Sequence, residues 1–230
     1  MNRIFITGDT HGDYDINKIT KFKNQLKKQE IKLDRNDYLI ICGDVGFFWD
    51  EGSFDAFIKQ YWEAQPFTML WIDGNHENFD KLNSIPIEKK WGGKVQKCAE
   101  NVYHLMRGEI YDICDRKFFT FGGAASHDKE YRKPGVSWWR QEMPTLEEMC
   151  NGLYNLGKCN YKVDYILTHC ADSYSQTQIN PLFKTDELTH YLYQIFLSAD
   201  WKKWFTGHYH ADVNLTNGVR VIYQDVIELD

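Results

Sequence analysis

The chain has 230 residues, of which 43% are hydrophobic and 26% are charged, and its formal charge at pH 7 is −6. This composition is typical of a globular protein with one sizeable core, and it excludes a disordered or fibrous chain. The negative charge disfavours duplex nucleic acid as the main partner, because such binding depends on a basic face that neutralises phosphates. We therefore expect residues 1–230 to form a single domain.

The spacing of the cysteines and the length of the apolar runs indicate the cellular location of the protein. The six cysteines form no Cys-x-x-Cys pair and show no framework spacing, which favours reduced thiols in the cytoplasm. A strand is predicted within a few residues of Met1, which leaves no room for the apolar segment of a signal peptide. No apolar run approaches the roughly 20 residues of a membrane helix, so we expect no membrane association. The sequence predicts no particular oligomeric state.

Five apolar segments along the chain each end at a polar corner. Runs rich in β-branched residues that stop abruptly are typical of buried strands. The segments are residues 3–8, 37–43, 67–72, 163–168 and 204–207, and they lead into Asp9-Thr10-His11, Asp44, Asp73-Gly74-Asn75-His76-Glu77, His169 and His208-Tyr209-His210.

The first two predicted helices lie between the first three strands. Residues 15–30 carry apolar side chains on one face, and a second helix begins at Ser53, a favourable N-cap. The face expected to be apolar in that second helix consists of Phe54, Phe57, Ile58, Tyr61 and Trp62. Alternation of strand and helix predicts a sheet with crossover helices, and such sheets place their sites at the carboxyl ends of the strands.

Two further helices are predicted in the second half of the chain. A Thr145/Glu148 capping box opens a helix over residues 145–156, and Gly157 is expected to close it. Another helix begins at about Thr185, after a loop over residues 171–184. The residues expected to face inward from the first of these helices are Leu146, Met149, Cys150 and Leu153.

The remaining segments are hairpins and one long loop. Residues 102–123 are strand-like with a polar break at 115–117, which predicts a hairpin or a strand pair. Asn217-Gly218 between two apolar runs predicts a hairpin with a type I′ turn. Residues 124–144 lack periodicity, and a loop of this length is usually functional or disordered. Two adjacent tryptophans in it argue against disorder.

The polar corners offer donors that suit divalent metals. Two ions about 3.5 to 4 Å apart need one ligand that bridges them, and a carboxylate can do so, which makes Asp44 the expected bridge. Asp44 would share the coordination of one ion with Asp9, His11 and one of the terminal histidines. It would share the coordination of the other ion with Asn75, His169 and the remaining terminal histidine.

Local features of the corners fit this interpretation. Alternate residues of an extended chain point the same way, which suits the Asp9-x-His11 and His208-x-His210 spacings. Carboxylate, amide and imidazole donors without thiolate suit Mn²⁺, Fe or Zn²⁺ better than Mg²⁺ or Cu, and we expect two divalent ions with Mn²⁺ favoured. A glycine, which lets the chain bend sharply, precedes several ligands, namely Gly8, Gly43, Gly74 and Gly207.

Five short motifs at these corners follow one another in a fixed order. They are Gly8-Asp9-Thr10-His11-Gly12, Gly43-Asp44, Gly74-Asn75-His76-Glu77, Thr168-His169 and Gly207-His208-Tyr209-His210. In content and order they resemble the motifs of the calcineurin-like metallophosphoesterases, and they cover nearly the whole chain. The resemblance implies an α/β fold, a four-layer α/β/β/α sandwich of two mixed sheets flanked by helices, with a dinuclear centre between the sheets.

By motif position, the resemblance also assigns roles to the candidate residues. It implies that Asp44 and His76 are catalytic and that Asn75 and His76 contact the substrate. His76 would touch the scissile phosphate or protonate the leaving oxygen, and the implied reaction is attack of a metal-bound hydroxide on a phosphoester. The implied ligands are Asp9, His11, Asp44 and His210 for the first metal, and Asp44, Asn75, His169 and His208 for the second.

The chain departs from the phosphoprotein phosphatase branch of this family after Asp44. That branch carries Asp and Arg at the third and fourth following positions, whereas this chain carries Phe47 and Phe48. His76 therefore needs another orienting partner, and the candidates are Asp50, Asp73 and Glu77. Phosphate also needs another cation, which the loop at about 124–144 would supply from Lys129, Arg132, Lys133 or Arg140.

The substrate expected from these features is a nucleotide-like or small phosphodiester. Trp138 and Trp139 would either stack on a base or anchor the loop in an apolar patch. The alternatives are a phosphomonoesterase acting on nucleotides or phosphoproteins, and a non-catalytic scaffold that keeps the metal pocket for binding.

Overall fold

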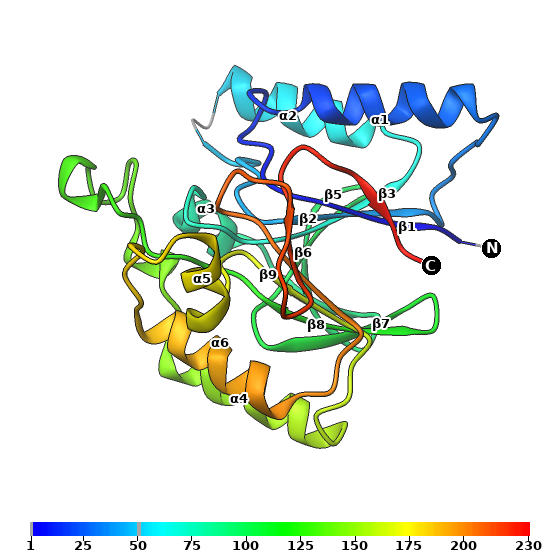
Figure 1. Ribbon diagram of the computed structural model, residues 1–230. Coiled ribbons are helices and arrows are strands. Elements are labelled where there is room, and N and C mark those ends of the chain that lie inside the picture. The colour runs from blue at the N-terminus through cyan, green and yellow to red at the C-terminus, as the bar shows by residue number, and fades with distance from the viewer. Residues whose placement is uncertain (1, 50–51) are drawn as a thin grey trace.

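The structure, a computed structural model, describes residues 2–49 and 52–230. Two β-sheets pack face to face, and helices cover the outer face of each sheet (Figure 1). This is the four-layer α/β/β/α arrangement of two mixed sheets that the family resemblance implies. In the part of the chain that the structure describes, no helix is both long and apolar enough to cross a membrane.

The first sheet contains seven strands in the order β13-β1-β2-β3-β6-β5-β4. Strands β1, β2, β3 and β6 are parallel to one another, and β13, β5 and β4 run antiparallel to their neighbours. The strands are β1 (Ile4–Thr7), β2 (Tyr38–Cys42), β3 (Thr68–Ile72), β4 (Ile87–Lys90), β5 (Gly93–Ala99), β6 (Val102–Leu105) and β13 (Ile227–Glu228). The helices in this half of the chain are α1 (Asn17–Lys28), α2 (Ser53–Glu63) and α3 (Phe79–Ser84).

The second sheet contains six strands in the order β11-β12-β10-β9-β8-β7. Its central strands β12, β10, β9 and β8 are parallel, and β11 and β7 are antiparallel to them. The strands are β7 (Glu109–Ile113), β8 (Arg116–Phe121), β9 (Tyr165–Thr168), β10 (Lys203–Thr206), β11 (Val213–Asn214) and β12 (Val219–Val221). The helices of this half are α4 (Leu146–Lys158), α5 (Ser173–Ile179) and α6 (Glu187–Ser198).

Strand alternation explains why the apolar runs are unbroken. Leu39 and Ile41 of β2 pack into a core that also contains Phe22 of α1. Ile40 and Cys42 of the same strand face the other way, into the core between the two sheets. Successive side chains of a strand point to opposite faces. Because both faces of the central strands are covered, both must be apolar.

The helices differ from the expected ones at their ends and faces. Ser53 is the first residue of α2 and does not cap it with its side chain. Phe57, expected on the apolar face of α2, is 50% exposed. In α4 the Thr145/Glu148 capping box is present, but the helix continues through Gly157 to Lys158.

Of the residues predicted to face inward from α4, Met149 packs partly buried against the core, but the other three are exposed. Leu146 is 73% exposed and Leu153 is 37% exposed, and Cys150 is exposed as well. The buried positions are Gly152 and Leu156. A Cβ atom on Gly152 would lie 2.2 Å from the hydroxyl of Tyr191. The helix therefore packs closely against its neighbours at a glycine, and a pattern of apolar side chains does not mark that position.

Several elements were missed or placed differently. The sequence patterns did not predict α3, β4, β5 or β13, and α5 lies in a segment expected to be a loop. The expected pair over residues 102–123 is three strands, because β6 joins the first sheet while β7 and β8 form a hairpin in the second. The last hairpin is confirmed, with β11 antiparallel to β12. Its turn is not type I′, because only Gly218 of the Asn217-Gly218 pair has a positive φ, of 92°.

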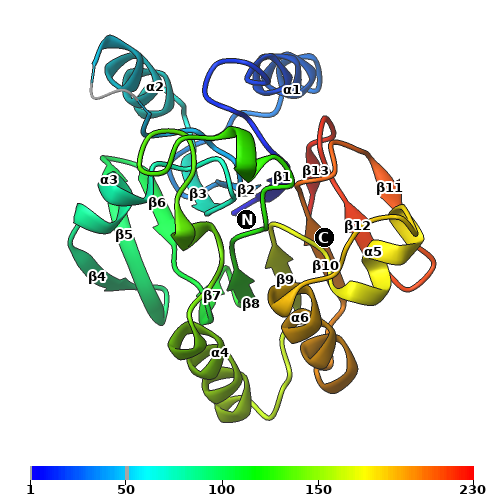
Figure 2. The same ribbon diagram turned by 90° about the vertical axis from the view of Figure 1, so that its left-hand side faces the viewer.

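The segment 124–144 is a long connection with two short 3₁₀ turns, Lys129–Tyr131 and Arg140–Glu142. It lies at the end of the molecule opposite the two chain termini (Figure 1). Figure 2 views the molecule from that end, with α1 and α2 on one side of the strands and α4 and α6 on the other.

Candidate metal centre

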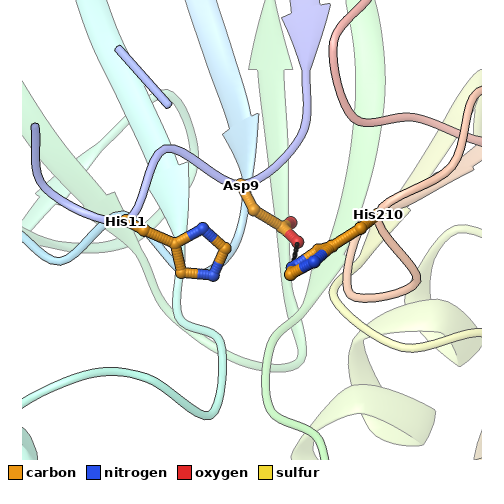
Figure 3. Close-up of side chains that lie close together, drawn as sticks. All are labelled: Asp9, His11 and His210. Carbon is orange, nitrogen blue, oxygen red and sulfur yellow. Dashed lines mark ion pairs between the residues drawn. The ribbon is translucent and has the colours of Figure 1, made fainter. Parts of the chain in front are cut away.

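Two groups of metal-type side chains lie at the carboxyl ends of the central strands. In each group the ligand atoms lie within 4.8 Å of one another. In the first, the side chains of His11 and His210 approach the carboxylate of Asp9 from loops after β1 and β10 (Figure 3). The second consists of Asp44, His169 and His208. The structure thus divides the two terminal histidines between the two groups.

Asp44 lies between the two groups. Its Oδ2 atom is 3.4 Å from Nε2 of His11, in the first group. The same oxygen is 3.4 Å from Nε2 of His169, in the second group. The other carboxylate oxygen, Oδ1, accepts a hydrogen bond from the backbone N–H of His76 at 2.7 Å. One oxygen of Asp44 is therefore held in place and the other faces both clusters.

The backbone at these corners is turned rather than extended. His11, Asp44, His208 and His210 have φ values of 44°, 48°, 69° and 47°. Few non-glycine residues adopt this left-handed conformation, and each instance costs on the order of 1–3 kcal/mol. The expectation that the His-x-His and Asp-x-His spacings reflect extended chain is therefore wrong. Such strain gathers at functional sites, where the surrounding structure holds it.

The glycines that precede the ligands make room for them. Gly43 has a φ of 92°, the left-handed conformation expected of a sharp bend. Gly74 and Gly207 have no such φ, but a Cβ atom on them would lie 2.0 Å from Oδ1 of Asp44 and 2.3 Å from Oδ1 of Asp9. A side chain at either position would therefore displace a carboxylate of the site.

Hydrogen bonds fix the rings of two histidines from behind. Nδ1 of His11 lies 2.8 Å from Oδ2 of Asp15, whose other oxygen accepts a hydrogen bond from the Tyr223 hydroxyl at 2.7 Å. Nδ1 of His169 donates to the backbone oxygen of Cys42 at 2.8 Å. Both contacts leave Nε2 free to face Asp44. Metal-ligating histidines are usually oriented by such a contact on the opposite nitrogen.

Asn75 is oriented by a buried chain of hydrogen bonds. Its side-chain N–H₂ group donates to the hydroxyl of Ser126 at 3.2 Å, and that hydroxyl donates to Oε2 of Glu142 at 2.6 Å. Asn75, Ser126 and Glu142 are 4%, 5% and 1% exposed. Oδ1 of Asn75 consequently points toward Nε2 of His169, at 3.2 Å. Both Ser126 and Glu142 belong to the long loop, and sequence reasoning missed them.

Lys18 places a buried positive charge behind Asp9. Its Nζ atom donates to the backbone oxygens of Gly8, Asp9 and Tyr223 at 2.9, 2.5 and 2.5 Å. Burial lowers the pKa of Lys18 to about 8, although the charge of Asp9 opposes this shift. No signal in the sequence distinguished Lys18 from the other lysines of α1.

The buried carboxylates control the charge state of the site. Asp9 and Asp44 are 0% and 1% exposed, and each raises the energy of the other's charge. Burial lowers the histidine pKa values, but the hydrogen bond and charge of Asp44 raise the pKa of His11 to about 9 and that of His169 to about 10. Burial and the charge of His169 lower the pKa of His208 to about 3.

The side chain of His76 lies closer to an arginine than to the carboxylate of Asp44, which is 4.0 Å away. Nη1 of Arg132 lies 2.9 Å from Nδ1 of His76, and Nη2 lies 3.4 Å from Nε2. The expected carboxylate partners are otherwise engaged, since Glu77 accepts from the N–H of Val45 and Asp73 pairs with Arg107. The third candidate, Asp50, lies outside the described residues.

The other predicted loop residues are more distant from the site or are buried. Lys129 and Arg140 are exposed, and within residues 2–49 and 52–230 no ion pair or hydrogen bond joins their side chains to the ligand residues. Trp139 is 4% exposed and its Nε1 donates to Asp80 at 2.8 Å, so it anchors the loop. Of the predicted loop cations, Arg132 alone contacts His76 among the described residues.

The donor set fits divalent cations. Two fully buried carboxylates need positive charge close to them, because an isolated buried charge is very costly. Imidazole nitrogens and one amide oxygen complete the set, and hard and borderline donors of this kind suit first-row divalent metals. The residues that would hold such ions are Asp9, His11, Asp44, Asn75, His169, His208 and His210.

Comparison with protein-family models identifies the family of the chain. The family described as calcineurin-like phosphoesterase matches residues 2–212 of the chain. A search of curated proteins gave no match. The matched region includes all seven candidate metal ligands and both β-sheets except β11, β12 and β13.

Proposed function

The chain belongs to the calcineurin-like phosphoesterases, a family of metal-dependent phosphoric ester hydrolases, and from this premise we propose a dinuclear phosphodiesterase. In this proposal Asp44 would hold both ions, and Asp9, His11 and His210 would hold one while Asn75, His169 and His208 would hold the other. When bound, two such ions supply a nucleophile from water at neutral pH and offset negative charge on the phosphate.

The protein's own residues are assigned the remaining tasks. Arg132 approaches both ring nitrogens of His76, with Nη1 2.9 Å from Nδ1 and Nη2 3.4 Å from Nε2. Nε2 is 4.0 Å from Oδ2 of Asp44. We assign His76 to proton donation to the leaving oxygen, a role typically worth about 10²- to 10⁴-fold in rate. We assign Arg132 to binding of a phosphate oxygen.

One observation carries the proposal, namely the position of Oδ2 of Asp44 at 3.4 Å from one histidine of each cluster. The direct test is hydrolysis of phosphoesters by the purified protein loaded with Mn²⁺, the metal that we propose. Turnover that is lost on chelation and restored by Mn²⁺ would support the proposal. Two bound ions without hydrolysis of any phosphoester would favour a metal-binding scaffold instead.

The preference for a diester rests on charge. A phosphomonoester carries about −1.5 to −2 at neutral pH, whereas a diester carries one negative charge. Phe47 is buried in the core, and Phe48 packs beside it, where the phosphoprotein phosphatase branch has a charged pair. Arg132 is then the cation next to His76. We expect faster hydrolysis of bis-para-nitrophenyl phosphate than of the mono ester, and the reverse order would favour a phosphomonoesterase acting on nucleotides or phosphoproteins.

We also propose a cytoplasmic location, which the spacing of the six cysteines supports. Cell fractionation tests it, and recovery of the protein with the membrane or extracellular fraction would contradict it.

A further inference from the structure

A small pocket adjoins the candidate metal centre. It lies between the loops after β1 and β2 and the start of α2, with a volume of about 220 Å³. Its walls are His11, Gly12, Gly46, Trp49, Phe54 and His76. His11 belongs to the first ligand group and His76 is the proposed proton donor. The pocket is therefore continuous with the place where the phosphate would bind.

The base of this pocket is glycine backbone. Gly12 and Gly46 have φ values of 66° and 63°, and the N–H of Gly12 donates to the backbone oxygen of Val45 at 2.8 Å. A Cβ atom on Gly12 would lie 2.5 Å from the ring of Phe54. The Phe54 ring thus lies directly against the main chain. A side chain at this position would push the ring away or fill the pocket.

Trp49 forms the outer wall. Its indole is 40% exposed, and it meets the buried Trp139 edge-on, with ring centroids 6.5 Å apart. Its backbone N–H donates to Oδ1 of Asp55 in α2 at 2.6 Å. An exposed aromatic ring held from behind in this way presents a flat apolar face next to the catalytic histidine. Trp139, one of the two tryptophans predicted to stack on a base, is 4% exposed and presents no open face for one.

Size and chemistry together indicate the occupant. Pockets for drug-sized ligands measure about 300–1,000 Å³, so this one holds a single ring system rather than a whole ligand. Aromatic rings recognise flat heterocycles by stacking, and every nucleobase has such a face. We propose, on the basis of the proposed function, that the pocket binds a nucleobase attached through its sugar to the scissile phosphate.

The inference is tested with two ligands that differ only in the base. Adenosine 5′-monophosphate and ribose 5-phosphate are compared as inhibitors of bis-para-nitrophenyl phosphate hydrolysis by the Mn²⁺-loaded protein. Stacking on one aromatic ring corresponds to about 5- to 100-fold in affinity. We expect the nucleotide to inhibit more strongly by a factor in this range. Equal inhibition by the two compounds would overturn the inference while leaving the proposed function intact.

Variants then locate the effect. Trp49→Ala should remove most of the difference between the two inhibitors, and Phe54→Leu, which keeps the apolar volume, should reduce it. Phe57→Ala is the matched control, because Phe57 is a half-exposed aromatic residue of the same helix that does not line the pocket. If both Trp49→Ala and Phe54→Leu kept the wild-type difference in inhibition between the nucleotide and ribose 5-phosphate, the assignment would be contradicted.

A wild-type protein that hydrolyses no phosphoester would remove the proposed function but not this test. Calorimetric titration of the Mn²⁺-loaded protein with the same two compounds then replaces inhibition. Tighter binding of the nucleotide that Trp49→Ala abolishes would support a nucleobase pocket. Equal affinity would refute it.

Discussion

Nη1 of Arg132 lies 2.9 Å from Nδ1 of His76, although the two residues are 56 positions apart in the chain. The contact joins the long loop to the corner after β3 and places a positive charge beside both ring nitrogens of His76. It places a cation where a carboxylate was expected. The loop thereby places one side chain in contact with a residue of the candidate site.

Arg132→Ala should lower kcat/KM. Hydrogen bonds to charged groups contribute about 1.5–3 kcal/mol, so we expect a loss of about 10- to 100-fold with metal content unchanged. Lys184→Ala, which removes an exposed cation from the loop after α5, is the control and should keep wild-type kinetics. Steady-state kinetics and elemental analysis measure both effects. Wild-type kinetics in Arg132→Ala would exclude a role in phosphate binding.

Substitutions of Asp44 and of His76 should have different effects on activity and on metal content. Asp44→Asn removes the bridging charge, so we expect it to lose most activity together with metal content. His76→Ala should lose about 10²- to 10⁴-fold in rate but keep its metal, because His76 is assigned to the leaving oxygen and not to an ion. If metal analysis showed equal loss of bound metal in both variants, these separate roles of Asp44 and His76 would be refuted.

Ser126→Ala should weaken metal binding without unfolding the protein. The change removes the acceptor of the Asn75 amide and leaves Glu142, 1% exposed, without the Ser126 hydroxyl as a partner. Loss of such supporting contacts typically costs about 10- to 100-fold in metal affinity or activity. Ser137→Ala is the control from the same loop, since within residues 2–49 and 52–230 its hydroxyl only accepts from the N–H of Lys133. Competitive titration with a metal indicator measures metal affinity. Equal metal affinity in both variants would contradict a supporting role for the hydrogen bonds from Asn75 through Ser126 to Glu142.

Arg107→Ala should destabilise the fold strongly. Arg107 donates to Oδ2 of Asp73 from Nε at 2.8 Å and from Nη2 at 2.5 Å, and both side chains are buried. Breaking a buried pair on one side typically costs about 3–5 kcal/mol in free energy of unfolding. Lys117→Ala breaks an exposed pair with Asp112 and should cost less than about 1 kcal/mol. Urea unfolding at pH 7 compares them, and similar losses would contradict the expectation.

The cost of Arg107→Ala should also depend on pH. Burial raises the pKa of Asp73, but the charge of Arg107 lowers it well below its ordinary value. The ionised pair therefore stabilises the wild type above the ordinary carboxyl range of about pH 4, and this contribution is lost as the pH falls toward the lowered pKa. Without Arg107, burial favours the neutral acid, so the difference between variant and wild type should shrink from pH 7 to pH 4. If the difference in unfolding free energy between wild type and Arg107→Ala grew as the pH fell, this prediction would be contradicted.

The central strands and the ligand corners could be predicted because one physical pattern marks both. A parallel strand covered on both faces reads as an unbroken apolar run, as in residues 38–42, and the run must stop where the chain reaches the polar site. The edge strands lack this pattern. In β4, Ile87 is 56% exposed and the next two residues, Glu88 and Lys89, are exposed as well. Strands that face solvent lack the unbroken apolar run that identifies a buried strand in the sequence.

The parts of the site that escaped prediction depend on tertiary contacts. Ser126 lies 51 positions from Asn75, and no local motif relates a loop serine to a strand-end asparagine. Trp49 follows the Gly-Asp corner closely, but its exposure depends on packing against Trp139. The left-handed backbone of His208 and His210 is likewise held by surrounding contacts, such as the bonds from the His208 N–H to both oxygens of Asp9.

The most direct test of the central claim is a crystal structure of the protein grown with Mn²⁺, with the ions located by anomalous scattering. The account predicts two ions about 3.5 to 4 Å apart, both bound by Asp44 and each also bound by the histidines of its own cluster. A single ion, or two ions of which only one contacts Asp44, would contradict it.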